Sequence, residues 1–139
     1  MQKSKPIKTK PITVALYNVS QTTEIKEICD FLEVQISKNL KKSESKVWHG
    51  SPVWFIDGNP IVSYSVRKSG KVSLMFFSGQ SFKEKDLKPE GTFKAAEILY
   101  ADKKEIKNTD LKKWLKKATG IQWDYKNIVK RKGRLEKLK

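Results

Sequence analysis

The middle of the chain, residues 46–78, limits the possible folds more than any other stretch, because dense apolar runs alternate there with clear turn signals. Asp57-Gly58 and Ser69-Gly70 are dipeptides that favour the positive φ angles of tight hairpin turns. Runs rich in Val, Ile, Phe, Trp and Tyr flank them and cover residues 46–49, 53–56, 60–68 and 71–77. The pattern predicts four consecutive antiparallel strands, with an interruption at Gly50-Ser51-Pro52 because proline cannot donate to a ladder.

The last two of these runs differ in the spacing of their apolar residues. Val62, Tyr64 and Val66 alternate with polar residues, which is typical of a strand with one buried face. Residues 74–77, Leu-Met-Phe-Phe, are apolar on both faces. We therefore expect a central strand that helices cover on one side and a loop, a partner or a ligand covers on the other.

Two amphipathic helices are predicted outside this region. The first, of about 18 residues, follows the polar run 20–23, and its buried stripe consists of Ile25, Ile28, Cys29, Leu32, Ile36 and Leu40. The second runs from a cap at Thr109 to Gly120, and its stripe consists of Leu111, Trp114, Leu115 and Ala118. A charged loop or short helix is expected at residues 82–91, a further strand within residues 92–100 and a short helix near residues 125–129.

The length of 139 residues fits one domain. We expect a flexible basic tail at residues 1–11, the domain at residues 12–130 and a basic C-terminal tail at residues 131–139. The apolar stretches are too short to span a bilayer, so no membrane insertion is expected. The single cysteine, Cys29, excludes an internal disulfide and suits a cytoplasmic location, and within the helix stripe it is expected to be a packing residue.

The formal charge of +15 comes from 30 Lys and Arg against 15 Asp and Glu. The excess gathers near the C-terminus, where nucleic acid or another anionic surface is a candidate partner. The candidate contact residues are Lys112, Lys113, Lys116, Lys117, Lys130, Arg131, Lys132 and Arg134. Lysines far outnumber arginines, which favours attraction to phosphates without sequence readout. The alternative is a solvated lysine-rich surface with no ligand.

The first helix carries acidic residues at intervals of three: Glu24, Glu27, Asp30 and Glu33. At 100° per residue they form a slanting ridge on the polar face, where neighbouring carboxylates could share a hard cation. The helix macrodipole alone also favours acidic residues in the first turns. Both interpretations remain open.

Aromatic residues in and around the strands are the candidates for a ligand pocket or an open sheet face. They are Trp48, Trp54, Tyr64 and Phe76, together with the single histidine, His49. At this density most aromatic rings belong to a core, but a surplus ring on an uncovered face would form a stacking platform. One histidine allows no His-based zinc site, and the sequence has no P-loop, GxGxxG, GxSxG or CxxC motif. We therefore predict no catalytic activity.

Trp48 and Pro52 in KVWHGSP, followed by FIDGNPIVSYSVRKSGKVSLMFF, resemble the signature of the YdhG-like domain family, a small bacterial domain of unknown function. The resemblance covers about residues 20–120. It implies an α+β fold of the frataxin type: a two-layer sandwich in which helices cover one face of an antiparallel sheet of about five strands.

Some members of this family are described as intracellular frataxin-like iron chaperones. The resemblance therefore implies iron as the candidate cofactor, with Glu24, Glu27, Asp30 and Glu33 at the proposed positions. Frataxins are acidic, whereas this chain is strongly basic, and a positive field weakens cation binding.

Three hypotheses follow. The first is a carrier of a metal ion or small ligand with an unknown protein partner. The second is a binder of nucleic acid or an anionic surface. The third is a monomeric or homodimeric domain whose open sheet face is an interface between copies.

Overall fold

The structure is a computed structural model that describes residues 13–139, so the tail predicted at residues 1–11 lies outside the described part of the chain. The fold is α+β, with helices and an open antiparallel sheet. In chain order the elements are α1 (Val14–Val19), α2 (Thr23–Asn39), β1 (Glu44–Trp48), β2 (Ser51–Ile56), β3 (Asn59–Val66), β4 (Val72–Phe76), the 3-10 turn η1 (Gly79–Phe82), β5 (Lys88–Pro89), β6 (Ala96–Tyr100), the 3-10 turn η2 (Lys103–Glu105), α3 (Asn108–Gly120) and the 3-10 turn η3 (Tyr125–Asn127).

The six strands form one sheet in the order β1-β2-β3-β4-β6-β5, and every neighbouring pair is antiparallel. The predicted run of four strands is confirmed as β1 to β4, and the predicted strand within residues 92–100 is β6. The short strand β5 was not expected. It pairs only with Ala96 and Glu97, so the rest of the outer edge of β6 is uncovered.

Tight turns join the first strands as the sequence predicts. Asp57 and Gly58 have φ angles of 52° and 81°, which is the type I′ conformation. His49 and Gly50 have φ angles of 54° and 83° and form a second two-residue turn of the same kind. The interruption predicted at residues 50–52 is therefore a two-residue turn at His49-Gly50, and Ser51 and Pro52 already belong to β2.

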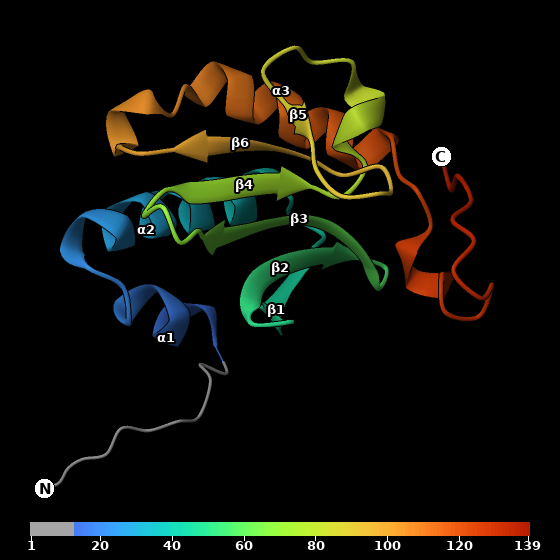
Figure 1. Ribbon diagram of the computed structural model, residues 1–139, viewed down its shortest axis with the longest axis horizontal. Coiled ribbons are helices and arrows are strands. Elements are labelled where there is room, and N and C mark those ends of the chain that lie inside the picture. Colours follow the sequence, from blue (N-terminus) through green and yellow to red (C-terminus); the bar gives the residue numbers. More distant parts are fainter. Residues whose placement is uncertain (1–12) are drawn as a thin grey trace, which may run out of the picture.

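Helices α2 and α3 pack on the same face of the sheet, here named the covered face. In the view of Figure 1, α2 lies behind β3 and β4, so the opposite, open face is turned toward the reader. The two predicted helix stripes are confirmed: Ile28, Cys29, Leu32 and Ile36 on α2, and Leu111, Trp114, Leu115 and Ala118 on α3, are buried. Within residues 13–139, no helix is long and apolar enough to cross a membrane.

Strand alternation directs one set of side chains into this core. Val62 lies opposite Phe76 and Tyr64 opposite Leu74 across β3 and β4, and all four side chains are fully buried. Trp54 of β2 joins them, and its indole nitrogen donates to Ser37 Oγ of α2 at 3.1 Å. The apolar contact between these strands and the two helices is the main stabilising term of the fold.

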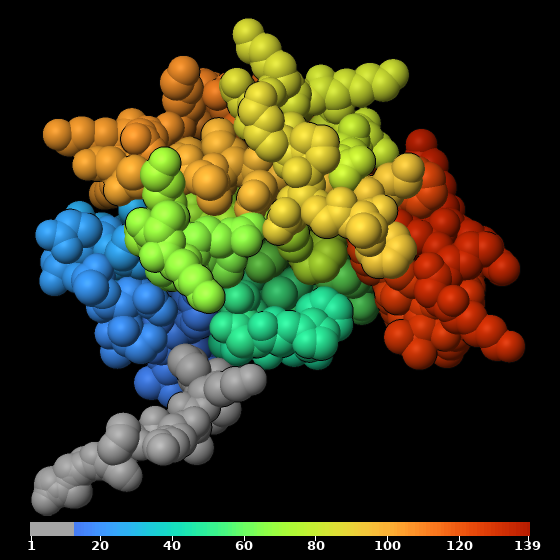
Figure 2. Space-filling model, in the orientation of Figure 1, coloured from blue at the N-terminus to red at the C-terminus, as the bar shows by residue number. Residues whose placement is uncertain are grey.

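The C-terminal segment differs from the tail expected at residues 131–139. It turns back so that residues 136–139 run antiparallel to residues 122–124. The amide of Gln122 donates to the carbonyl of Lys139, and the amide of Asp124 donates to that of Glu136. This segment forms the bulge at one end of the sheet in Figure 2.

Candidate functional site

A row of aromatic rings lies on the open face. We define the aromatic row as Phe55, Trp48, Phe77, Tyr125 and Phe93. Neighbouring ring centroids are 5.5 Å apart for Trp48 and Phe55, 6.4 Å for Trp48 and Phe77, 5.4 Å for Phe77 and Tyr125, and 6.3 Å for Phe93 and Tyr125. These are the spacings of favourable edge-to-face pairs, so the five rings form one contiguous surface.

The pleat of the sheet places the first rings of the row. Phe76 points into the core, so Phe77, the next residue, points to the open face. Trp48 and Phe55 come from β1 and β2. The His49 ring lies 4.1 Å from that of Trp48, at the turn where the row begins.

Tyr125 is fixed by two hydrogen bonds rather than by a strand. Its hydroxyl donates to the carbonyl of Phe77 at 2.6 Å and accepts from the amide of Lys94 at 3.1 Å. Burial raises the pKa of Tyr125, so its hydroxyl stays protonated and able to donate at neutral pH. The C-terminal segment thereby adds the ring of Tyr125 to the aromatic row, whose first rings come from the sheet.

The row is partly exposed to solvent. Trp48 and Phe93 keep 38% and 45% of their surface accessible, whereas Phe55 is buried at the base of the row. Lys46 Nζ lies 4.9 Å above the ring of Phe55, and Lys94 Nζ lies 4.6 Å above the ring of Trp123. The exposed rings of Trp48 and Phe93, with the ammonium groups of Lys46 and Lys94 on neighbouring rings, can accept a planar ligand that carries negative charge.

Two adjoining hollows begin at Lys126, the residue after Tyr125, and we name them the basic groove because five lysines and two aspartates line them together. The first has a volume of about 550 Å³ and is lined by the side chains of Lys38, Lys41, Lys42 and Lys139 among others. The second, of about 380 Å³, shares Ile56, Asp57 and Lys139 with the first and extends to Lys126, the residue after Tyr125. Along residues 13–139, Lys38, Lys41, Lys42 and Lys139 form no ion pair, so their charges are available to an anion.

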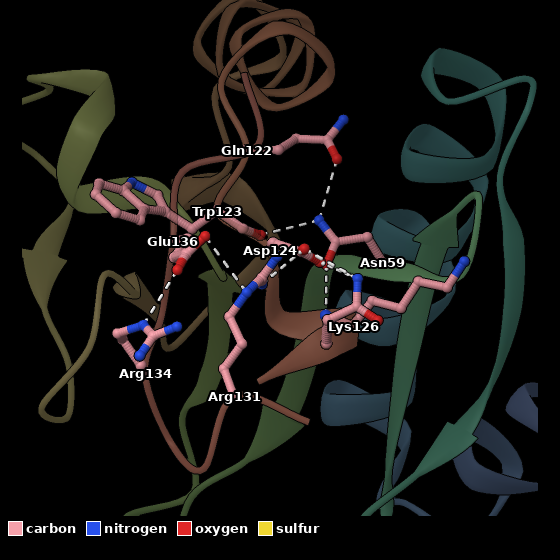
Figure 3. A network of polar contacts seen from close by, with 9 residues as sticks. Asn59, Gln122, Trp123, Asp124, Lys126, Arg131, Arg134 and Glu136 are labelled. Carbon is pink, nitrogen blue, oxygen red and sulfur yellow. Dashed lines mark hydrogen bonds and ion pairs between the residues drawn. The ribbon is translucent and has the colours of Figure 1, made fainter. Parts of the chain in front are cut away.

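A polar network holds the C-terminal segment against the β2–β3 turn (Figure 3). Asn59 donates to the side chain of Gln122 at 3.1 Å and to the carbonyl of Trp123 at 3.0 Å, and it accepts from the amide of Lys126. Asp124 accepts from Asn127 and from Arg131, the latter at 2.8 Å. This network positions Tyr125 and Lys126 where the aromatic row meets the basic groove.

Asp124 is the central charge of this network. Only 6% of its side chain is exposed. Hydrogen bonds from Asn127 and Arg131 hold its pKa below the ordinary carboxylate value, although burial alone would raise it. Its negative charge is therefore matched within the network and does not repel an anion at the groove.

The opposite end of the open face has a different character. Arg67 forms an ion pair with Glu97 and another, at 3.1 Å, with Glu90, and Ser73 donates to Glu97 at 2.6 Å. One arginine therefore faces two carboxylates, and the local charge is not positive. An anionic ligand is expected to avoid this end and to follow the row toward Tyr125.

The predicted pocket aromatics fall on both faces of the sheet. Two members of the predicted set, Trp48 and His49, lie on the open face. Trp54, Tyr64 and Phe76 are core residues with at most 1% of their surface exposed, so they are not part of the open face. The predicted set did not include Phe77, Tyr125 or Phe93, although Phe77 belongs to the strand that was expected to be apolar on both faces.

The four acidic residues predicted as a ridge do not converge on one point. Asn18 Nδ2 donates to Asp30 at 3.1 Å and to Glu33 at 2.9 Å, and Lys26 pairs with Asp30 at 2.6 Å. Burial and the nearby Asp30 raise the pKa of Glu33. The side chains of Glu24 and Glu27 are exposed. In the described part of the chain, no group of three or more His, Cys, Asp or Glu residues could hold a metal ion.

The predicted basic contact residues divide into two groups. Lys113 and Lys117 pair with Glu84, at 3.3 and 2.5 Å, and both Arg131 and Arg134 pair with Glu136. The members that form no ion pair with any residue from 13 to 139 are Lys112, Lys116, Lys130 and Lys132, all exposed. The structure adds the lysines of the basic groove, which sequence reasoning did not find.

Comparison with known proteins gave no relative: no protein-family model, curated protein or solved structure matches the chain. The resemblance to the YdhG-like family therefore rests on the residues around Trp48 and Pro52 and on the strands that follow. The arrangement of side chains is the remaining source of information about function.

Proposed function

We propose that the protein is a non-enzymatic domain that binds single-stranded nucleic acid across the open face of its sheet. The observation that carries this proposal is the contact between two surfaces of complementary chemistry. Tyr125 belongs to the aromatic row, and the next residue, Lys126, lines the basic groove. Bases of a single strand stack on the rings while the phosphates follow the lysines.

The chemistry of the surface also indicates that it does not recognise a particular base sequence. Stacking on a ring contributes about 1–3 kcal/mol per base and is tolerant of sequence. Lysine ammonium groups attract phosphate without the bidentate geometry by which arginine reads guanine. We therefore expect binding with little sequence preference and with an affinity that falls steeply as salt rises.

The proposal also covers the family and the fold of the chain. We propose that the chain is a YdhG-like domain with a frataxin-like two-layer sandwich, and that it works in the cytoplasm. The helices on one face of the sheet and the turn at His49-Gly50, within the W-x-G-x-P element, support this assignment. In this interpretation, the W-x-G-x-P element places Trp48 at the rim of the open face.

A carrier of iron or another metal ion is the second proposal, since Asp30 and Glu33 both reach the same amide nitrogen of Asn18 and therefore lie close together. A cation would have to displace Asn18 and compete with Lys26. Titration with ferrous iron of the wild type and of a Glu27→Lys, Asp30→Lys variant tests it. Equal and negligible heats would remove the metal proposal.

The nucleic-acid proposal is tested with a short fluorescein-labelled oligothymidylate and fluorescence anisotropy. Trp48→Ala is expected to weaken binding by about 1–3 kcal/mol, which is about 5- to 140-fold in Kd. Val34→Ala is the matched control, because Val34 is an exposed apolar residue on α2, on the other side of the sheet. The affinity should also drop between about 50 and 200 mM salt.

Two results would contradict the proposal. The first is an absence of binding at low salt. The second is equal binding by Trp48→Ala and the wild type, because the open face would then not be the contact surface.

Sedimentation of the free protein distinguishes the third hypothesis, in which exposed residues of this face, such as Leu99, pair with a second copy.

A further inference from the structure

The two edges of the sheet differ in how they are protected from pairing with another chain. At one edge the short strand β5, which ends in Pro89, pairs with part of β6. Short edge strands and edge prolines are common means of preventing such pairing. The other edge is β1, a five-residue strand with no proline and with a register against β2 that runs without a bulge. Within residues 13–139, no strand lies on its outer side.

The main-chain groups of β1 point alternately toward β2 and away from it. In a hairpin with a two-residue turn, the residues that flank the turn, here Trp48 and Ser51, form a hydrogen-bonded pair. Ser45 and Val47 therefore direct their amides and carbonyls away from β2. Among residues 13–139 these outward groups bond to no other main-chain group. Helix α1 contacts β1, but Ser45 is exposed.

The charges of β1 are self-complementary in one antiparallel register. When two copies pair about a two-fold axis at Ser45, Glu44 of each copy lies opposite Lys46 of the other. Opposite charges across a strand pair are stabilising, whereas an axis at Lys46 would place two lysines opposite each other. Glu44 and Lys46 are both exposed, and neither forms an ion pair with any residue from 13 to 139.

We infer that the outer edge of β1 pairs antiparallel with β1 of a second copy, with Ser45 at the two-fold axis, so that one sheet continues through both copies. The two Ser45 residues exchange main-chain hydrogen bonds, and a Glu44–Lys46 ion pair lies on each side of them. Directly opposite residues lie on the same face of a sheet, and Lys46 lies on the open face, above the ring of Phe55. The open faces of both copies therefore point to the same side.

This interface is separate from the open face. Pairing at the edge leaves the aromatic rows of both copies uncovered, so the inference does not depend on the proposed function and does not conflict with it. An extended segment of a different protein could use the same main-chain groups. A second copy is the better partner because it also supplies the opposite charge for both Glu44 and Lys46.

Sedimentation velocity of the full chain over a range of concentrations tests the edge. We expect a monomer–dimer equilibrium whose Kd rises about tenfold or more in Ser45→Pro, because proline removes the outward hydrogen-bond donor. The fold should tolerate this change, since the Ser45 amide does not bond to β2. Leu99→Ala is the matched control. It removes an exposed side chain from the open face of β6 and should change the Kd by less than about twofold.

Two charge variants test the register. Glu44→Lys and Lys46→Glu each place like charges opposite one another, and each alone should weaken self-association by about tenfold or more. Mixed in equal amounts, the two variants should form a heterodimer with a Kd close to that of the wild type, because every opposed pair again has opposite charges. This measurement also decides the question if Ser45→Pro does not fold.

Three results would overturn the proposal. The first is a chain that stays monomeric at every concentration. The second is a dimer that Ser45→Pro leaves intact, and a loss of that dimer in Leu99→Ala would then place the contact on the open face. The third is a mixture of the two charge variants that associates no better than either variant alone, because the axis at Ser45 requires them to pair.

Discussion

The two faces of the sheet carry similar residues and have opposite roles. On the covered face, Trp54 and Phe76 are buried under α2 and α3. On the open face, Trp48 and Phe93 keep 38% and 45% of their surface accessible. Aromatic side chains on the first face stabilise the fold, and we propose that those on the second bind bases. The face on which a ring lies, rather than its residue type, decides which role it has.

The clearest contrast is between two neighbouring residues, Phe76 and Phe77. Phe76→Ala removes a fully buried ring and should lower the free energy of unfolding by about 3–5 kcal/mol. Phe77→Ala removes a half-exposed ring and should cost about 1 kcal/mol. Urea unfolding of both variants measures the difference. Similar losses for both would mean that the open face belongs to the core.

Cys29 tests whether the covered face is closed to solvent. Burial, with smaller effects of Asp30 and Glu33, raises the pKa of its thiol to about 12. At pH 8 the thiolate fraction is then about a thousandfold lower than in the unfolded chain. We expect a thiol reagent such as DTNB to label Cys29 only as fast as the protein unfolds. Rapid labelling without denaturant would show that the helices do not seal this face.

Tyr64 measures the contribution of a buried hydrogen bond on the covered face. Its hydroxyl donates to Asn18 Oδ1 at 2.7 Å, and both residues are buried. Tyr64→Phe should lower the free energy of unfolding by about 1–3 kcal/mol, because the amide oxygen loses its partner. Oligonucleotide affinity measured under folded conditions should stay unchanged. A loss of affinity would break the separation between the two faces.

Acid should loosen the C-terminal segment that supplies Tyr125 to the open face. The pKa of Asp124 is lowered in the folded protein by Asn127 and Arg131. A carboxylate of this kind stabilises the fold above its ordinary pKa of 3.8, and the stabilisation is lost as the pH falls toward the lower folded value. The urea midpoint of the wild type should therefore drop below about pH 4 more than that of Asp124→Asn. Parallel pH profiles of the two proteins would contradict this assignment.

Local signals in the sequence predicted most of the covered face. The apolar spacing of α2 and α3 and the Asp57-Gly58 turn follow from rules that involve only near neighbours along the chain. Where both faces of a strand are apolar, the sequence alone does not show which face packs against the helices. Phe76 and Phe77 fit either orientation, and the register that settles it depends on pairing with β3.

The open face and its groove were harder to predict because distant segments build them. Tyr125 joins the row through hydrogen bonds to Phe77 and Lys94, which lie more than thirty residues away in sequence. The basic groove brings Lys38 of α2 beside Lys139. Residues 131–139 look like a charged tail, and the backbone bonds that hold them to residues 122–124 have no sequence signature.

Photochemical crosslinking tests the central claim most directly. An oligonucleotide that carries 5-iodouracil is irradiated in complex with the protein, and the crosslinked peptides are identified by mass spectrometry. The predicted result is attachment at Trp48, Phe77, Tyr125 or Phe93 on the open face. Crosslinks confined to α3 or to the outer surface of α2 would show that the aromatic row is not where the bases bind.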